Sequence, residues 1–174
     1  PPPAGITDQN RGNALIAPEV PSRPRGLELR QDGTRADFPG MSGIEDDHQR
    51  GRLLHFFANH ELLATELMAL VLLKFPDAPT EFRAGILSTL KEEQIHTKMY
   101  LGRMAQCGVE FGELPVNGFF WKMVSSVKTP LDYVTRLSLT FEQANLDYAR
   151  GYAAIFGEAG DKKTAALLQR IYED

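Results

Sequence analysis

Two long stretches with helical spacing of apolar residues, separated by the short break FPDAP, constrain the fold of this chain most strongly. In residues 42–75 apolar side chains recur every three to four positions, the period of one helical face: Leu53, Leu54, Phe57, Leu63, Leu67 and Val71. The sequence SGIE, which begins at Ser42, has the pattern of a capping box. Thr80 is the expected N-cap of a second helix that ends at Cys107, with Gly108 as its stop. These signals predict an antiparallel helical hairpin.

The second half of the chain predicts two further helices. Residues 108–129 form a mixed connection with one short helix expected around Trp121. Thr129 followed by Pro130 is typical of a helix start, and this third long helix is expected to reach about Phe156. The sequence GEAGD turns the chain, and TAALLQRIYED begins a fourth helix. No strand pattern competes, so we expect an all-α fold, an antiparallel four-helix bundle.

The first 41 residues differ from the rest in composition. Proline and glycine gather in PPPAGI, APEVPSRPRG and QDGTRADFPG, and no period is sustained. Such a composition predicts an extended arm that lies on the domain, or disorder. We therefore expect a Pro-rich N-terminal arm, residues 1–41, and one helical domain, residues 42–174. The sequence stops at IYED within a helical pattern, so this domain is expected to be C-terminally incomplete.

Charge and cysteine content exclude several classes of function. The 174 residues correspond to one domain, and their net charge of −4 gives no basic field for nucleic acid or anionic lipid. The longest apolar run, Leu67–Leu73, is far shorter than the roughly 20 residues that span a bilayer, so no membrane partner is expected. Cys107 is the only cysteine, which leaves no disulfide framework. A reducing cytoplasmic location is the expectation.

The pair Glu93 and His96 interrupts an apolar helical face. The same stripe of the helix holds Ile86, Leu90, Tyr100 and Met104. Residues three apart on a helix can reach the same ion, and a Glu-x-x-His pair is one such arrangement. Glu45 and His48 have the same spacing, but they lie in a first helical turn and are expected to be a solvated helix end.

Two more carboxylates, Glu61 and Glu142, also lie on apolar helical faces. Glu61 and Glu93 are each 16 residues from Asp77, the centre of FPDAP. An antiparallel hairpin therefore places both at one height, about 24 Å from the turn at 1.5 Å per residue. The position that faces Glu142 across GEAGD lies about two residues beyond Asp174, where a second Glu-x-x-His pair is expected.

Converging carboxylates need a counter-charge, because an unpaired buried carboxylate costs several kcal/mol or becomes protonated. No Lys or Arg lies one turn from Glu61, and Lys98 is on the wrong side of its helix. A Glu from two helices with Glu-x-x-His from the other two holds di-iron or di-manganese centres in helix bundles. We therefore expect two Fe ions, with Mn as the alternative. A metal-free polar network, or a rotated bundle with these groups in water, is the competing interpretation.

The motifs LLHFFANHELLATEL, FPDAP, KEEQIH, FGELPV, FEQANLD and GDKKTAALLQRIYED occur in this order over residues 42–174. In order and spacing they resemble an uncharacterised bacterial family of the ferritin-like, dimetal-carboxylate superfamily. The resemblance implies a ferritin-like bundle with four metal ligands in this chain: Glu61, Glu93, His96 and Glu142. In that family the helix continues with Glu-x-x-His directly after the position of Asp174. The chain as given would then hold four of six expected ligands, and its metals are expected to be weakly bound or absent.

Five further residues are candidates for contacts with these ligands: Glu92, Asp174, Tyr100, Glu66 and His60. By position, Asp174 is expected to orient His96, and Glu92 the histidine of the fourth helix. Tyr100 is expected to pack in the core, with a hydrogen bond to a ligand or the transfer of an electron as the alternatives. Glu66 is either a buried hydrogen-bonding residue or lies near the site, and His60 is a core or groove histidine unless it approaches the metals.

The leading functional hypothesis is a dinuclear iron or manganese oxidoreductase that activates O₂ in the bundle core and acts on an unknown small molecule. One alternative is ferritin-like iron oxidation for storage or detoxification, which predicts a shell-forming oligomer. The other is a metal-free helical interaction module. The sequence leaves a homo-oligomer open, and the chain ending at Asp174 is expected to be inactive.

Overall fold

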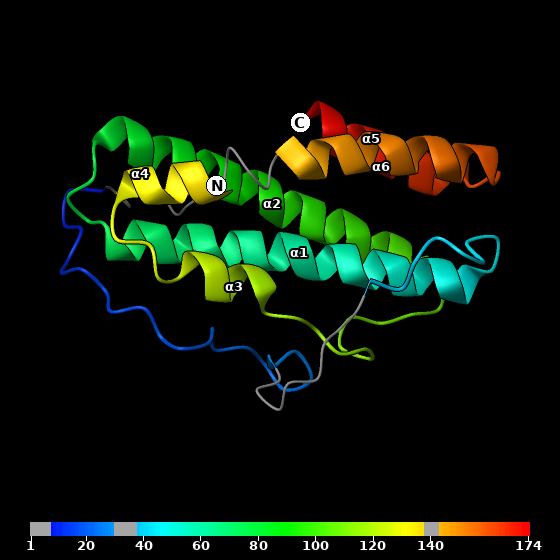
Figure 1. Ribbon diagram of the computed structural model, residues 1–174, viewed down its shortest axis with the longest axis horizontal. Coiled ribbons are helices and arrows are strands. Elements are labelled where there is room, and N and C mark those ends of the chain that lie inside the picture. The colour runs from blue at the N-terminus through cyan, green and yellow to red at the C-terminus, as the bar shows by residue number, and fades with distance from the viewer. Residues whose placement is uncertain (1–7, 30–37, 138–142) are drawn as a thin grey trace.

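The computed structural model describes residues 8–29, 38–137 and 143–174, except for the side chains of 143–147. All regular secondary structure in these residues is helical. This confirms the predicted all-α class. The described residues contain no strand, and they form six helices (Figure 1): α1 (Asp47–Lys74), α2 (Thr80–Gln106), α3 (Phe119–Val124), α4 (Pro130–Tyr133), α5 (Gln143–Glu158) and α6 (Lys162–Glu173).

The helices α1 and α2 form the long hairpin that the two apolar periods predict. They lie side by side in opposite directions, with α5 and α6 as a second hairpin over the C-terminal half of α2 (Figure 1). The short helix α3 packs on the other side of α1 and contains Trp121, as expected. The end of α2 is also as predicted, since Cys107 is its C-cap and Gly108 has a φ of 74°.

The predicted start of the first helix is wrong. Helix α1 begins at Asp47, and its N-cap is Asp46, whose carboxylate accepts a hydrogen bond from the backbone N–H of Gln49 at 3.0 Å. Gly43 explains the difference, because its φ of 77° turns the chain before a helix can begin. The expected capping box at Ser42 is therefore replaced by a turn.

The predicted cap of the second helix is displaced by one residue. Pro79 is the N-cap position of α2, and Thr80 is the first helical residue. The hydroxyl of Thr80 is used elsewhere, because it accepts a hydrogen bond from the Arg11 guanidinium at 3.0 Å. A threonine that binds a side chain from a distant segment cannot be recognised from local pattern.

The region of the third predicted helix is described in two parts. Thr129 and Asp132 form a capping box with Pro130 in the first turn, which confirms the predicted start. Residues 134–137 continue as a wider π-helical turn. The predicted continuity of this helix falls on residues 138–142, outside the described residues, and α5 extends to Glu158.

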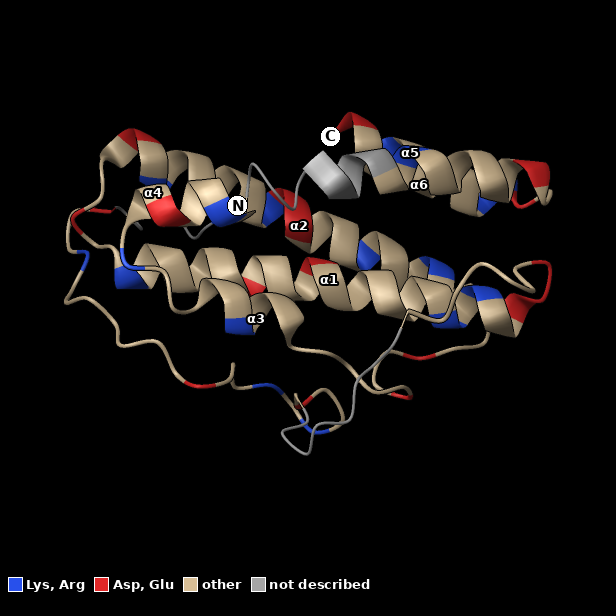
Figure 2. Cartoon of the chain, viewed as in Figure 1, with Lys and Arg blue, Asp and Glu red and all other residues tan. Residues whose placement is uncertain are grey.

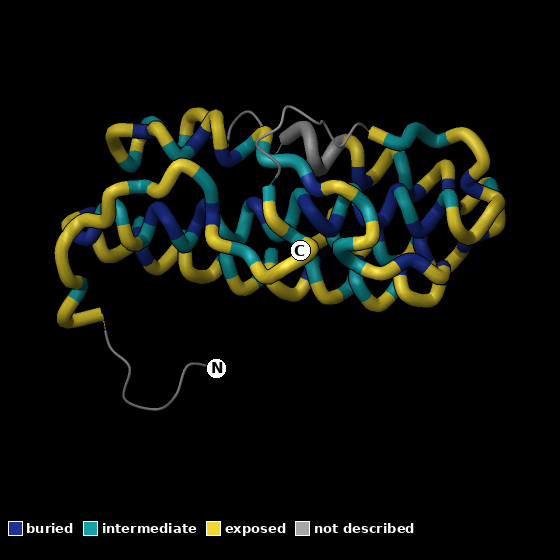
Figure 3. Tube along the Cα trace, turned by 90° about the horizontal axis from the view of Figure 1, so that it is seen from below, coloured by how far each residue is buried: buried dark blue, intermediate teal, exposed yellow. Residues whose placement is uncertain are grey.

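The apolar core consists of two clusters of buried residues. One joins α1 and α2 to α5 and α6 and includes Leu53, Leu54, Tyr100, Met104, Phe156 and Leu168. The other lies toward the α1–α2 turn and includes Leu63, Leu67, Val71, Trp121, Tyr133 and Leu137. Buried positions line the inner helix faces in Figure 3, and Figure 2 shows acidic positions near the middle of both α1 and α2. Glu61 lies in α1 between the two clusters.

Residues 8–29 contain no helix and run along the hairpin (Figure 1). Their main anchor is Arg23, whose guanidinium donates two hydrogen bonds of 2.7 Å to the Glu66 carboxylate and one of 3.1 Å to the Asn59 amide oxygen. The side chain of Arg23 is only 1% exposed. The ring N–H of Trp121 also donates to backbone carbonyls of this segment. A segment without regular structure is thus fixed by specific polar contacts.

Among the described residues, α1 alone is long and apolar enough, by length and composition, to cross a membrane, with a mean hydropathy of 1.4 over its most apolar stretch. The core helix of a soluble protein passes the same test, so this is weak evidence for a membrane. Of that stretch, 39% is buried inside the structure. Its packing against α2 and α3 accounts for this part of its apolar character.

Candidate metal centre

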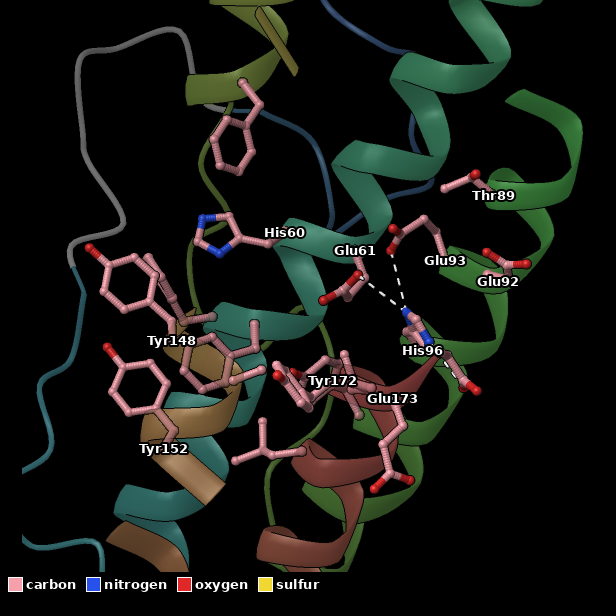
Figure 4. Close-up of a pocket in the computed structure, with 18 of the residues that line it drawn as sticks. His60, Glu61, Thr89, Glu92, Glu93, His96, Tyr148, Tyr152, Tyr172 and Glu173 are labelled. Atoms are coloured by element: carbon pink, nitrogen blue, oxygen red, sulfur yellow. Dashed lines mark ion pairs between the residues drawn. The ribbon is translucent and has the colours of Figure 1, made fainter. Parts of the chain in front are cut away.

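Helices α1 and α2 bring Glu61, Glu93 and His96 together, and one ligand atom from each lies within 4.8 Å of the others (Figure 4). The Nδ1 atom of His96 is 3.7 Å from Oε2 of Glu93 and 4.0 Å from Oε2 of Glu61. Glu93 and His96 share one face of α2 because they are three residues apart. Glu61 faces them from α1, as expected from its equal distance to the turn. A carboxylate–carboxylate–imidazole set of this kind could hold a metal ion.

Two atoms of this cluster are buried without a hydrogen-bond partner. They are Oε2 of Glu93 and Nε2 of His96, in side chains that are 15% and 9% exposed. Each has an ionisable neighbour at 3.4–3.7 Å, but the geometry does not make a hydrogen bond. Buried polar atoms in native proteins nearly always have a partner, so these two leave room for another group. Oε2 of Glu93 suits a divalent transition-metal ion, and Nδ1 of His96, which faces both carboxylates, is the nitrogen that could bind the same ion while Nε2 faces Asp174.

Burial and mutual interactions shift the pKa values of all three cluster residues. Burial, followed by the hydrogen bond and negative charge of Glu93, raises the pKa of Glu61 well above its ordinary value. Burial would also raise the pKa of Glu93, but its interactions with the neighbouring Glu61 carboxyl and His96 imidazole lower it on balance. Burial lowers the pKa of His96, and the carboxylates of Glu93 and Asp174 more than reverse this. The three side chains are therefore coupled: Glu61 is biased toward its protonated form, Glu93 toward its carboxylate and His96 toward its imidazolium.

Three of the neighbouring candidates lie at the cluster. Oδ2 of Asp174 is 3.4 Å from Nε2 of His96, where the expected orienting carboxylate should be. Glu92, the neighbour of Glu93 in the sequence, lines a cavity that adjoins the cluster (Figure 4). Tyr100 also lines it and is 3% exposed; burial and then the carboxylates of Glu61 and Glu93 raise the pKa of its hydroxyl well above its ordinary value.

The remaining candidates are placed differently. Glu142 lies outside the described residues. Glu66 is not among the residues that line the cavity, and its carboxylate pairs with Arg23, which agrees with the alternative of a buried hydrogen-bonding residue. His60 lines the cavity, with its ring between those of Phe56 and Phe120, at centroid distances of 4.4 and 5.0 Å. Burial lowers the pKa of His60 to about 4, so this imidazole is neutral at pH 7.

A cavity of about 890 Å³ adjoins the cluster, and most of its apolar lining was not predicted from the sequence. The aromatic residues come from several elements and from the segment before α1: Phe38, Phe56, Phe57, Phe119, Phe120, Tyr148, Tyr152 and Tyr172. A local signal exists for one pair, because Tyr148 and Tyr152 are four residues apart on α5 and their rings stack at 6.0 Å. The approach of Phe38 to Phe56 has no such signal.

The described residues that line the cavity include no Lys or Arg. No lysine or arginine therefore supplies a counter-charge to the carboxylates of the cluster, and His96 is the basic group that faces them. A divalent cation would provide that charge and a partner for the unpaired atoms. The residues present fit a metal.

These features define the class: an all-helical protein with a buried carboxylate–histidine cluster beside an aromatic cavity. The chain belongs to the family described as Protein of unknown function (DUF455), whose sequence profile matches residues 4–174. Comparisons with curated proteins and with solved structures find no match.

Proposed function

We propose that this protein is a ferritin-like four-helix bundle in which a dinuclear iron or manganese centre activates O₂ for the oxidation of a small organic molecule. Glu61, Glu93, His96 and Glu142 are its ligands in this chain. The observation that carries the proposal is the cluster of Glu61, Glu93 and His96, with unpaired buried atoms on Glu93 and His96. The motif order and spacing described above support the ferritin-like assignment.

Each residue of the cluster has a definite task in this proposal. Glu61 and Glu93 bind cations across the α1–α2 interface and share a proton when no cation is bound. Asp174 fixes the ring orientation of His96, as carboxylates do for metal-binding histidines. The two ions supply redox electrons and open coordination positions when bound. Tyr100 and the aromatic lining keep bulk water from the reacting molecule.

Metal analysis of the protein at its natural length, purified with iron or manganese available, tests the proposal. We expect about two ions per chain. Glu93→Ala and Glu142→Ala should each lose metal, while Glu81→Gln, at an exposed position of α2, should retain it. A protein that folds and contains neither metal would contradict the proposal and favour a helical interaction module.

The cavity favours an organic substrate over iron storage, because a storage site needs no aromatic cavity of this size. Oxygen consumption that depends on an added organic substrate or reductant would support the enzyme. Repeated Fe(II) oxidation with growth of a mineral core, and without organic substrate, would instead identify storage or detoxification.

A further inference from the structure

One side of the cavity is a continuous set of rings, here called the aromatic wall: Phe38, Phe56, Phe57, His60, Phe120, Tyr148 and Tyr152. Each ring is within 6.2 Å of another member of the set, centroid to centroid. Phe38 packs edge-on against Phe56 and stacks on Tyr152, so the segment before α1 and helix α5 close one surface. A wall of ring faces and edges binds flat apolar molecules well.

The opposite side of the cavity is acidic. Its carboxylates come from α1, from α2 and from the end of α6: Glu61, Glu92, Glu93, Glu173 and Asp174. Figure 4 shows His60, Tyr148 and Tyr152 on one side, Glu92, Glu93 and His96 on the other, and Glu61 between them. Asp174 pairs with Arg170 at 2.6 Å, and the described residues that line the cavity include no Lys or Arg to face the other carboxylates. An anion would meet like charge here.

We propose that the cavity selects a flat, apolar organic amine as the substrate of the dinuclear centre and rejects carboxylates and phosphates of the same shape. This inference rests on the proposed function for its chemistry, but it concerns binding alone. The volume of about 890 Å³ lies in the usual range of small-molecule sites.

Three physical effects act together. The ring body loses contact with water when it stacks on the aromatic wall. An ammonium group is attracted by the ring faces and by the carboxylates. Metal ions would neutralise Glu61 and Glu93, while Glu92 and Glu173, which are not assigned as ligands, retain their charge. The preference for a cation therefore persists in the metal-loaded protein.

A matched series of fluorescent probes tests the inference: 9-anthracenemethylamine, 9-anthracenemethanol and 9-anthracenecarboxylate. They share one ring system and differ in charge, so fluorescence titration of the protein at natural length, with and without metal, isolates the electrostatic effect. We expect the amine to bind at least tenfold more tightly than the carboxylate, with the alcohol between them. Equal affinities, or tighter binding of the carboxylate, would overturn the inference.

Two kinds of variant assign the effect to the two sides of the cavity. Glu92→Gln combined with Glu173→Gln should reduce the preference for amine over carboxylate severalfold and leave the alcohol unchanged. Tyr152→Ala should weaken all three probes together. Glu81→Gln, on α2 but away from the cavity, is the control for a general loss of charge and should retain the wild-type order.

The outcomes separate this inference from the proposed function. The expected order of probes in a protein that never binds metal would support the inference and contradict the dinuclear centre. Two bound metal ions in a protein that shows no preference among the three probes would support the dinuclear centre and contradict the inference. If none of the probes binds, the inference is wrong.

Discussion

At the scale of single residues, the cluster of Glu61, Glu93 and His96 brings two carboxylates and an imidazole together in one largely buried site. Burial and the neighbouring Glu93 raise the pKa of Glu61, while Glu61 and His96 lower the pKa of Glu93, so a proton at this pair is favoured on Glu61. The burial of both groups nevertheless costs free energy that apolar residues would not. Such sites commonly trade stability for function.

This balance gives a first prediction. Glu61→Gln has nearly the shape of the protonated carboxyl, so it should leave the free energy of unfolding of the metal-free protein within about 1 kcal/mol of wild type, or raise it. The same change should abolish metal binding, because an amide is a poor ligand for these ions. Urea unfolding and metal analysis of the same samples provide the test. A large loss of stability without a loss of metal would show that Glu61 is purely structural.

The ring of His96 was predictable as a partner of Glu93 because their spacing is local. Glu66 was not predictable in this way, since its partner Arg23 lies 43 residues earlier in a segment without periodicity. Pattern can place a residue on a helical face. It cannot show which distant side chain approaches that face.

At the scale of elements, α6 is docked on the α1–α2 hairpin through Asp161. This carboxylate is the N-cap of α6, where it accepts hydrogen bonds from the backbone N–H and hydroxyl of Thr164. It also pairs with Arg50 of α1 at 2.8 Å and with Arg103 of α2 at 2.9 Å. Three helices thus meet at one side chain, and the far end of α6 carries Asp174 to His96.

The pKa of Asp161 predicts an acid dependence of stability. Burial would raise this pKa, but hydrogen bonds from Thr164 and then Arg103 lower it below 3.8. The ionised form is therefore favoured in the folded state, and its contribution is present above the unfolded pKa and is lost as the pH falls through the folded value. Asp161→Asn should reduce the free energy of unfolding by about 3 kcal/mol at pH 7.

Denaturant unfolding at pH 7 and near pH 3 checks this prediction. The difference between wild type and Asp161→Asn should shrink at the lower pH, because the stabilisation from ionised Asp161 is lost as the pH falls from the unfolded pKa toward the lowered folded pKa. Asp77→Asn, at an exposed position in the α1–α2 turn, is the control and should change stability by less than about 0.5 kcal/mol at either pH. A difference that does not depend on pH would contradict the role given to the charge.

The close approach of α1 to the chain after α2 gives a third prediction. A Cβ atom on Gly51 would lie 2.5 Å from Cγ2 of Val109, so Gly51→Ala should overpack the core and cost about 1–3 kcal/mol. Gly102 is also helical but has no atom within 4 Å of such a Cβ. Gly102→Ala should therefore stabilise by up to about 1 kcal/mol. Thermal unfolding of both variants tests this account. A shift of both melting temperatures in the same direction would contradict it.

At the scale of the whole molecule, the segment 8–29 is part of the folded structure through Arg23. Arg23→Ala leaves the Glu66 carboxylate without its partner, so we expect a loss of about 3 kcal/mol and faster proteolysis within residues 8–29. Arg23→Met with Glu66→Leu replaces both charges by apolar groups and should recover most of the loss. Limited proteolysis and urea unfolding measure the two effects, and equal loss in both variants would exclude the ion pair as the cause.

Much of the fold followed from two periodicities and one short break, because helix length and turn position also determine which residues face each other. The same geometry predicted that Glu61 would meet Glu93 and His96. The predicted start of the first helix at Ser42 was wrong because Gly43 turns the chain, and the capping pattern does not reveal this turn. The aromatic wall was missed because its rings come from four separate parts of the chain, and no local pattern joins Phe38 to Tyr152.

The position of Glu61 between two buried clusters has a consequence for engineering. Because the two clusters are separate, Leu54 and Leu67 belong to packing units that share few neighbours. Substitutions on either side should therefore combine additively, as they do for distant sites without shared partners. Either end of the hairpin could then be repacked for thermostability while the acidic middle is left untouched.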